Sequence, residues 1–207
     1  MKKIINAFLI SLAFLAVFVA HSLVRAQQKI EMTQEQATKS VDYLLPYPGI
    51  LPDNPLYKIK MLRDRILAFF ITDPVKKAEY YLLMADKRIN AGKMLIDYGK
   101  PALGDETLSK GQAYMVKAIE ELKRAKESER DISGLIEKLD KATSKHLEVL
   151  KTVLEKAPEN AKKGIQNAIE NSQKGHDRVL EIMEKKKEKL EEKQEKKEEK
   201  PTETPEE

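Results

Sequence analysis

Apolar residues recur at spacings of three and four along the middle of the chain, the pattern that predicts amphipathic helices. Two consecutive runs carry this pattern: Ala78, Leu82, Ala85, Ile89, Gly92 and Ile96, then Leu108, Met115, Ala118, Leu122 and Ala125. Asp73 and Pro74 precede the first run and supply a capping side chain followed by a proline at the first helical position. The pattern therefore predicts two neighbouring helices, the first of which begins at this pair.

Turn residues mark where these helices should end. Tyr98-Gly99 followed by Pro101 is typical of a helix stop and a breaker, so we expect the next helix to start near Asp105. The segment 128–131, Ser-Glu-Arg-Asp, is either a capping box that opens a further helix or part of one continuous helix.

The second half of the chain has the most regular pattern. The apolar seam first runs through Ile132, Leu135, Leu139, Ala142, His146, Val149 and Val153, and then through Ile165, Ile169, Ser172, His176, Val179 and Met183. Pro158 separates the two runs, because proline ends one helix and is tolerated at the start of the next. We predict an antiparallel, coiled-coil-like helical hairpin, with Val153 opposite Ile165 and a long charged C-terminal helix. The fold class is all-α, a helical bundle.

A proline-rich segment, residues 41–57, precedes the first helical run. Its prolines forbid regular structure, yet its tyrosines and leucines are too apolar for a free linker. We expect an extended strap across a helical groove, with a partner-binding peptide as the alternative. Asn54 and Pro55 then predict a helix to about Ile71. Its apolar side comprises Leu56, Ile59, Leu62, Ile66, Phe69 and Phe70.

The N-terminus resembles an export signal. Lys2 and Lys3 precede an apolar run over residues 4–20, and small residues occupy the positions before a cleavage point between Ala26 and Gln27. The alternative is an uncleaved anchor formed by residues 4–20, which is marginally long for a membrane span. We therefore expect an extracytoplasmic protein: secreted, periplasmic or on the cell surface.

These features divide the chain into five parts. They are a signal or anchor (1–26), a polar spacer (27–42), a helical domain with the strap (43–127), the hairpin (128–190) and a charged disordered tail (191–207).

Charge and composition exclude several classes of function. The 38 Lys and Arg against 34 Asp and Glu fall to 35 against 34 once residues 1–26 are removed, which is too balanced for nucleic-acid binding. The absence of cysteine excludes disulfides, zinc–thiolate sites and cysteine nucleophiles. A glycine-rich phosphate loop and a G-x-S-x-G elbow are also missing, so we expect no enzyme and no cofactor.

Two sequence blocks resemble a known family. Leu51-Pro52-Asp-Asn-Pro55-Leu56-Tyr57-Lys-Ile-Lys60 is similar to the P-x-x-P-L-Y-x-x-K opening of a bacterial domain of unknown function, DUF family 5667. Asp73-Pro74-Val-Lys-Lys-Ala-Glu-Tyr-Tyr-Leu82, with Ala85 and Arg88, resembles its second block. The resemblance covers about residues 43–126 and implies an exported helical domain, but no activity and no catalytic residue.

His146 and His176 are the candidate site residues, because both fall on the apolar seam of the hairpin. The predicted register staggers them by about one helical turn, roughly 6 Å. A shift in register would bring them together, and with Glu148 or Asp177 they could then hold a divalent metal or respond to acid. The alternative is that each is a polar residue that fixes the register of the hairpin.

These observations favour a non-enzymatic extracytoplasmic scaffold or partner-binding module. A protein partner or an envelope component is expected, and membrane association only if the N-terminal segment is retained. The alternatives are a metal- or pH-responsive envelope sensor that uses His146 and His176, and a small envelope chaperone.

Overall fold

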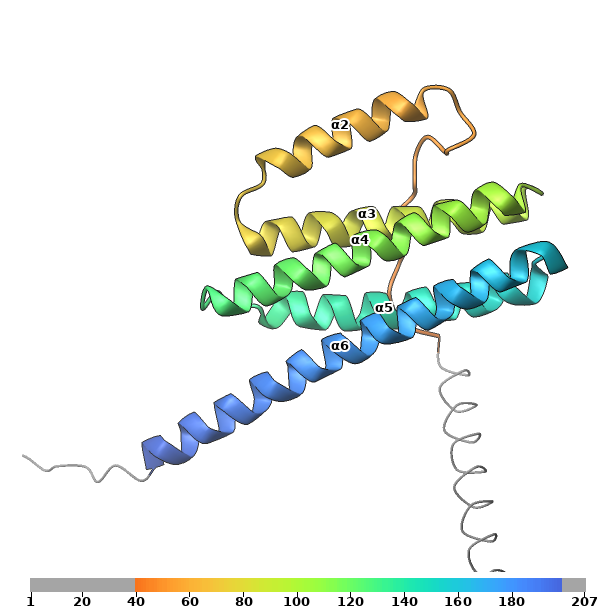
Figure 1. The fold of residues 1–207 in the computed structure, drawn as a ribbon. Coiled ribbons are helices and arrows are strands. Elements are labelled where there is room, and N and C mark those ends of the chain that lie inside the picture. Colours follow the sequence, from red (N-terminus) through yellow and green to blue (C-terminus); the bar gives the residue numbers. More distant parts are fainter. Residues whose placement is uncertain (1–39, 199–207) are drawn as a thin grey trace, which may run out of the picture. The chain divides into compact units, whose positions relative to one another are not determined.

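The computed structural model describes residues 40–198, and the surroundings of side chains as far as residue 192. This part of the chain is helical, with no strand, and consists of α2 (Tyr57–Phe70), α3 (Pro74–Asp97), α4 (Pro101–Glu127), α5 (Ser133–Lys156) and α6 (Glu159–Glu198). Helices α3 to α6 pack side by side, and α2 lies outside them next to α3 (Figure 1). The predicted all-α helical bundle is confirmed. Residues 1–39 and 199–207, including the proposed cleavage point at Ala26 and Gln27, lie outside the described residues.

Helix α3 begins and ends where the sequence indicated. Pro74 is its first residue, and the Asp73 carboxylate accepts a hydrogen bond from the backbone N–H of Lys76 at 3.0 Å. At the other end Gly99 has φ +73°, the left-handed conformation that glycine adopts without strain. The expected role of Pro101 was wrong: it is the first residue of α4, which therefore starts four residues before Asp105. Proline is tolerated there because the first N–H of a helix has no partner within the helix.

The connection between α4 and α5 is a true break. Glu129 has φ 54°, which ends the helix that precedes it. The expected capping box is not formed, because Ser128 is the C-cap of α4 and Ile132 is the N-cap of α5. The Asp131 carboxylate accepts hydrogen bonds from the backbone N–H and the hydroxyl of Ser133, the first residue of α5. Arg130 forms an ion pair with Asp73 at 2.7 Å and so fastens this connection to the start of α3.

Helices α5 and α6 run antiparallel on either side of Pro158, which is exposed between them. The side chain of Lys186 reaches Ser133, and His176 reaches Thr143, so the register agrees with the predicted one to within about a residue. The coiled-coil character of this packing stays a prediction. Helix α6 continues to Glu198, so residues 191–198 are helical and not the expected disordered tail. Alternating Lys and Glu at helical spacing support an exposed helix of this kind.

The core consists of two apolar clusters, each lined by α3 to α6. The first contains Ala78, Leu82, Ala85, Met115, Ala118, Ile119, Leu122, Ala125, Ile132, Leu135, Ile136, Leu139, Ala142, Val179 and Ile182. The second contains Ile89, Ile96, Leu108, Leu150, Val153, Ala157, Ala161, Ile165 and Ala168. Helices α3 and α4 approach closely at Gly92 and Gly104, where a methyl group on either glycine would collide with the other helix.

These contacts unite the two parts that the sequence suggested as separate. Residues 41–198 belong to one compact unit, and α5 packs directly on α3. The expected boundary between a helical domain ending at residue 127 and a hairpin starting at residue 128 is therefore not a domain boundary. Within residues 40–198, every helix is too short or too polar to cross a membrane.

Candidate functional site

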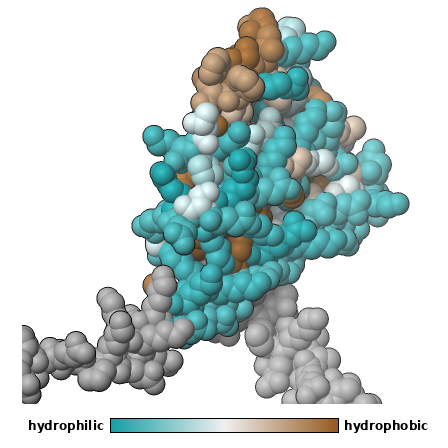
Figure 2. All heavy atoms as spheres, turned by 60° about the vertical axis from the view of Figure 1, so that its left-hand side comes forward, coloured by the Kyte–Doolittle hydropathy of each residue, from teal (hydrophilic) through white to brown (hydrophobic). Residues whose placement is uncertain are grey.

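The apolar side of α2 faces solvent along its whole length. The exposed residues are Leu56, Ile59, Leu62, Ile66, Leu67, Phe69 and Phe70, and the last two are 80% and 73% exposed. We call these seven residues the outer face of α2. Figure 2 shows them as an apolar cap at the top of a molecule whose visible surface is otherwise largely hydrophilic. Folded proteins rarely leave so continuous an apolar surface open unless it contacts something else.

The start of α2 differs from the prediction. The helix begins at Tyr57, two residues after the expected first position at Pro55. The Asn54 carboxamide oxygen accepts a hydrogen bond from the backbone N–H of Leu56, so Asn54 holds a turn that precedes the helix. Pro52 is half-buried in this turn, and Pro55 is exposed.

The side of α2 that faces the bundle is polar. Its buried residues are Tyr57, Lys60 and Asp64, which recur at helical spacing. The ammonium group of Lys60 donates hydrogen bonds to the backbone carbonyls of Pro48 and Ile50 in the strap. Burial lowers the pKa of Lys60 to about 8, because the charged form loses its hydration and the nearby Arg88 disfavours it further.

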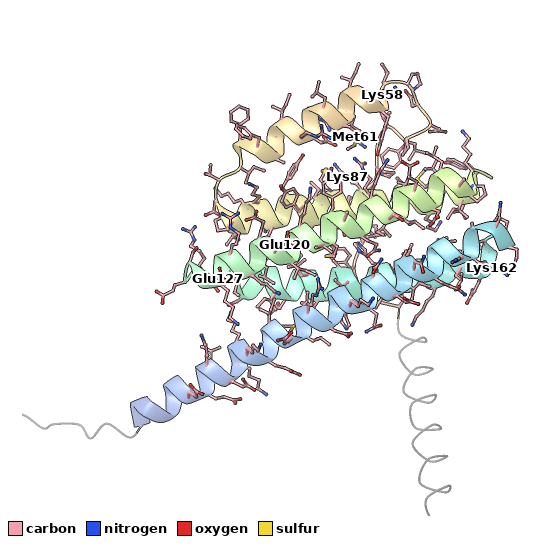
Figure 3. All side chains as sticks on the ribbon, in the orientation of Figure 1. Lys58, Met61, Lys87, Glu120, Glu127 and Lys162 are labelled. Carbon is pink, nitrogen blue, oxygen red and sulfur yellow. The ribbon has the colours of Figure 1, made fainter. Side chains whose placement is uncertain are left out.

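Arg88 of α3 explains why α2 turns this side inward. Its side chain is fully buried, and the guanidinium lies over the rings of Tyr57 and Tyr114 at 5.1 and 5.9 Å from their centroids. The Asp64 carboxylate is 3.9 Å away and provides the opposite charge. The sulfur of Met61, which points from α2 toward α3 (Figure 3), also contacts this guanidinium. A buried charge without such partners would cost several kcal/mol.

A second anchor joins α2 to α3. The Tyr80 hydroxyl donates a hydrogen bond of 2.8 Å to the backbone carbonyl of Asp64, and burial raises the pKa of Tyr80 to about 12. The orientation of α2 is therefore fixed by polar contacts on its inner side. Because these polar contacts face the bundle, the apolar side of α2 faces away from it.

Basic side chains border the outer face of α2. Lys58, Arg63 and Arg65 are exposed, whereas Asp64, the sole acidic residue of Tyr57–Phe70, is buried. A shallow hollow of about 470 Å³ adjoins the helix, and its lining combines Ile59 and Arg63 with Lys87 of α3. The surface is thus apolar along its centre and positively charged at its edges.

The proline-rich segment lies across α3 and α5. The Tyr43 hydroxyl donates a hydrogen bond of 2.6 Å to Asp86, the side-chain amide of Asn90 donates to the carbonyl of Pro46, and the N–H of Val41 donates to Glu148. Burial, followed by the hydrogen bond to the Asp86 carboxylate, raises the pKa of Tyr43. The segment is a strap held by side chains from two helices.

The two candidate histidines bind different carboxylates. His146 Nε2 lies 2.7 Å from Asp86 Oδ1, whereas His176 Nδ1 lies 3.0 Å from Thr143 Oγ1 and 3.5 Å from Asp140. Of the residues that the structure describes, no three potential ligands converge on a metal-sized site. The alternative of a metal site with Glu148 or Asp177 is therefore not formed among the described residues. The predicted register staggers the two histidines by about one helical turn. In the structure each of them accordingly contacts a different carboxylate.

His146 belongs to a set of buried polar residues drawn from all four bundle helices. Asp86 of α3 binds His146 of α5, and Ser172 of α6 donates a hydrogen bond of 3.1 Å to Gln112 of α4. We call these four residues the polar layer. All four side chains are buried. Such a set fixes which helix faces meet, because a shifted register would leave its members unpaired.

Sequence reasoning missed Lys60, Asp64, Asp86 and Arg88. Arg88 could have been found, because it occupies the arginine position of the second family-like block and directly precedes the core residue Ile89. A buried arginine requires an acidic partner, but the sequence does not single out Asp64 as that partner. Asp86 carries no such signal in the sequence.

Comparison with known proteins gives one match. No curated protein and no solved structure matches the chain. The family model described as a domain of unknown function, DUF5667, matches residues 49–160 and so extends through α5, beyond the 43–126 suggested by the two sequence blocks. This match covers more than half of the sequence, and the chain belongs to the DUF5667 family.

Proposed function

We propose that the protein is a non-enzymatic binding module that acts through the outer face of α2. The observation that carries this proposal is the inverted packing of α2, whose apolar residues are exposed while Lys60 and Asp64 are buried. A surface of this kind lowers its free energy when it is covered by another apolar surface, at about 25 cal/mol per Å² removed from water.

The packing beneath α2 supports this proposal, because it makes the exposure a stable property of the fold. A half-turn of α2 about its axis would bury Ile59 and Leu62 but would remove Asp64 from Arg88 and Lys60 from the strap carbonyls. The polar contacts therefore hold the apolar side outward. Scaffolding and partner binding both require a surface that is available in this way.

Site-specific cross-linking tests the proposal. A photo-reactive benzoylphenylalanine replaces Leu62 in the full chain, which is then produced in its native cells and irradiated. The matched control carries the same residue at Leu180, an exposed leucine of α6. We expect an adduct, with a protein or with a lipid, from position 62 and none from position 180.

A second variant checks that the adduct depends on the apolar surface. Ile59→Ser, Ile66→Ser and Phe69→Ser are added to the chain with the probe at position 62, and the adduct should disappear. These side chains are exposed, so the substitutions should change the free energy of unfolding by less than about 0.5 kcal/mol each. Equal labelling at positions 62 and 180, or no adduct at either, would overturn the proposal.

A further inference from the structure

We infer that the outer face of α2 binds the surface of a lipid bilayer that contains anionic headgroups. This inference rests on the proposed function and names the occupant of the same surface. It is a peripheral interaction made by α2, and it does not depend on whether residues 4–20 are retained as an anchor.

Charge is the first argument for this occupant. The exposed charged side chains of α2 are Lys58, Arg63 and Arg65, and Lys87 of α3 lines the same hollow as Arg63. Helices that lie in a membrane interface combine an apolar side with lysine and arginine on the polar side, as α2 does. Each basic residue close to an anionic bilayer contributes about 1 kcal/mol to binding.

Shape is the second argument. The apolar residues of α2 project outward from the bundle, and Phe69 and Phe70 form an edge-to-face pair that is mostly exposed at the end of the helix. Figure 2 shows the apolar cap as a projection rather than a recess. A projecting helix fits a deformable bilayer, into which an interfacial helix sinks by roughly 5–10 Å.

The charge distribution disfavours two other occupants. A second copy paired by two-fold symmetry would place Lys58, Arg63 and Arg65 against the same basic residues. Residues 1–30 of the same chain are apolar enough to cover α2, but they contain four basic and no acidic residues. An anionic bilayer supplies both the apolar interior and the opposite charge.

The test uses the absence of tryptophan from the chain. Phe69→Trp in the full-length protein places a single fluorophore on the outer face of α2, and Leu180→Trp places one on α6 as the control. Both proteins have the same N-terminus, so association through residues 4–20 affects both equally. Each protein is mixed with vesicles of phosphatidylcholine alone or of equal parts phosphatidylcholine and phosphatidylglycerol, with and without brominated acyl chains.

We expect the emission of Phe69→Trp to shift to the blue and to be quenched by the brominated chains in the anionic vesicles only. The emission of Leu180→Trp should not change. Lys58→Gln with Arg65→Gln should lower partitioning by about 30-fold, the effect of two basic residues near the surface. Arg63 is left in place because it donates a hydrogen bond to Asp64. Leu62→Trp repeats the measurement in the middle of the helix in case Phe69→Trp disturbs its end.

Three results would overturn the inference. One is the absence of quenching at both positions 62 and 69, and another is equal quenching in neutral and anionic vesicles. The third is a blue shift without lipid that grows with protein concentration, which would identify a second copy as the occupant. If the brominated lipids do not quench but the cross-linker at position 62 still gives a protein adduct, the proposed binding module is kept and the lipid bilayer is rejected as its partner. If both fail, the proposed function falls as well.

Discussion

His146 Nε2 and Asp86 Oδ1 are 2.7 Å apart, and their side chains are 1% and 4% exposed. The two residues lie 60 positions apart in the sequence, so their contact joins α5 to α3 across the bundle. Asp86 also accepts the hydroxyl of Tyr43, which makes this carboxylate the meeting point of two helices and the strap.

Removal of one side chain of this pair should lower the stability of the fold. We expect His146→Leu to lower the free energy of unfolding by about 1–3 kcal/mol, because the buried Asp86 carboxylate would lose its contact with His146 and keep only the hydrogen bond from Tyr43. The double variant Asp86→Leu, His146→Leu should lose less than the single variant. Urea unfolding measures both, with His176→Leu as a control at a half-buried position. A double variant that is less stable than His146→Leu would contradict this account of the pair.

Tyr43→Phe should loosen the strap. The variant loses one hydrogen bond to a buried carboxylate, and we expect a loss of about 1–3 kcal/mol. Hydrogen exchange of residues 41–48 should accelerate, since the hydroxyl is one of the few contacts that hold them. Tyr47→Phe is the matched control, because Tyr47 is exposed and should show neither effect. Unchanged exchange in Tyr43→Phe would show that the other strap contacts are sufficient.

Gly92→Ala should destabilise the crossing of α3 and α4. A Cβ atom at this position would lie 2.6 Å from the side chain of Leu108 and 3.0 Å from the carbonyl oxygen of Gly104. We expect a loss of about 1–3 kcal/mol in thermal or urea unfolding, since the backbone must move apart. Gly134→Ala in α5 is the control: nothing lies within 4 Å of its added methyl group. It should raise stability by a few tenths to about 1 kcal/mol.

The lowered pKa of Lys60 predicts how the stability of the fold changes with pH. Its pKa is about 8 in the folded protein and near its ordinary value of 10.5 in the unfolded chain. Between these values the unfolded chain binds more protons, so stability from this residue rises with pH in that window. Relative to Lys60→Met, the native protein should therefore gain melting temperature as the pH rises from about 8 to about 10.5.

The buried tyrosines titrate in both proteins, so their contribution cancels in the comparison. A difference in melting temperature between the two proteins that stays constant with pH would show that Lys60 titrates normally.

The sequence predicted the bundle well where apolar spacing controls packing. The residues expected inside α3 and α4, from Ala78 to Ala125, are buried in the observed core. The stop at Gly99 and the cap at Asp73 followed from local chemistry, which requires no knowledge of distant contacts. Local rules were insufficient for Pro101, because a proline can either break a helix or begin one.

The candidate site could not be predicted in the same way. Apolar periodicity shows that α2 has two sides, but which of them faces the bundle depends on Arg88, 24 positions beyond Asp64. The same applies to His146, whose place on the apolar seam suggested a contact within the hairpin although its partner, Asp86, lies on α3. In both cases a long-range polar contact between helices determines the arrangement.

The length of α6 determines how far its C-terminal end lies from the bundle. Lys186 lies beside Ser133, the first residue of its antiparallel partner α5, so the 12 residues from there to Glu198 extend about 18 Å beyond α5 at 1.5 Å per residue. Figure 1 shows this segment leaving the bundle as a single helix. The end of α6 at Glu198 is therefore held at a set distance from the bundle.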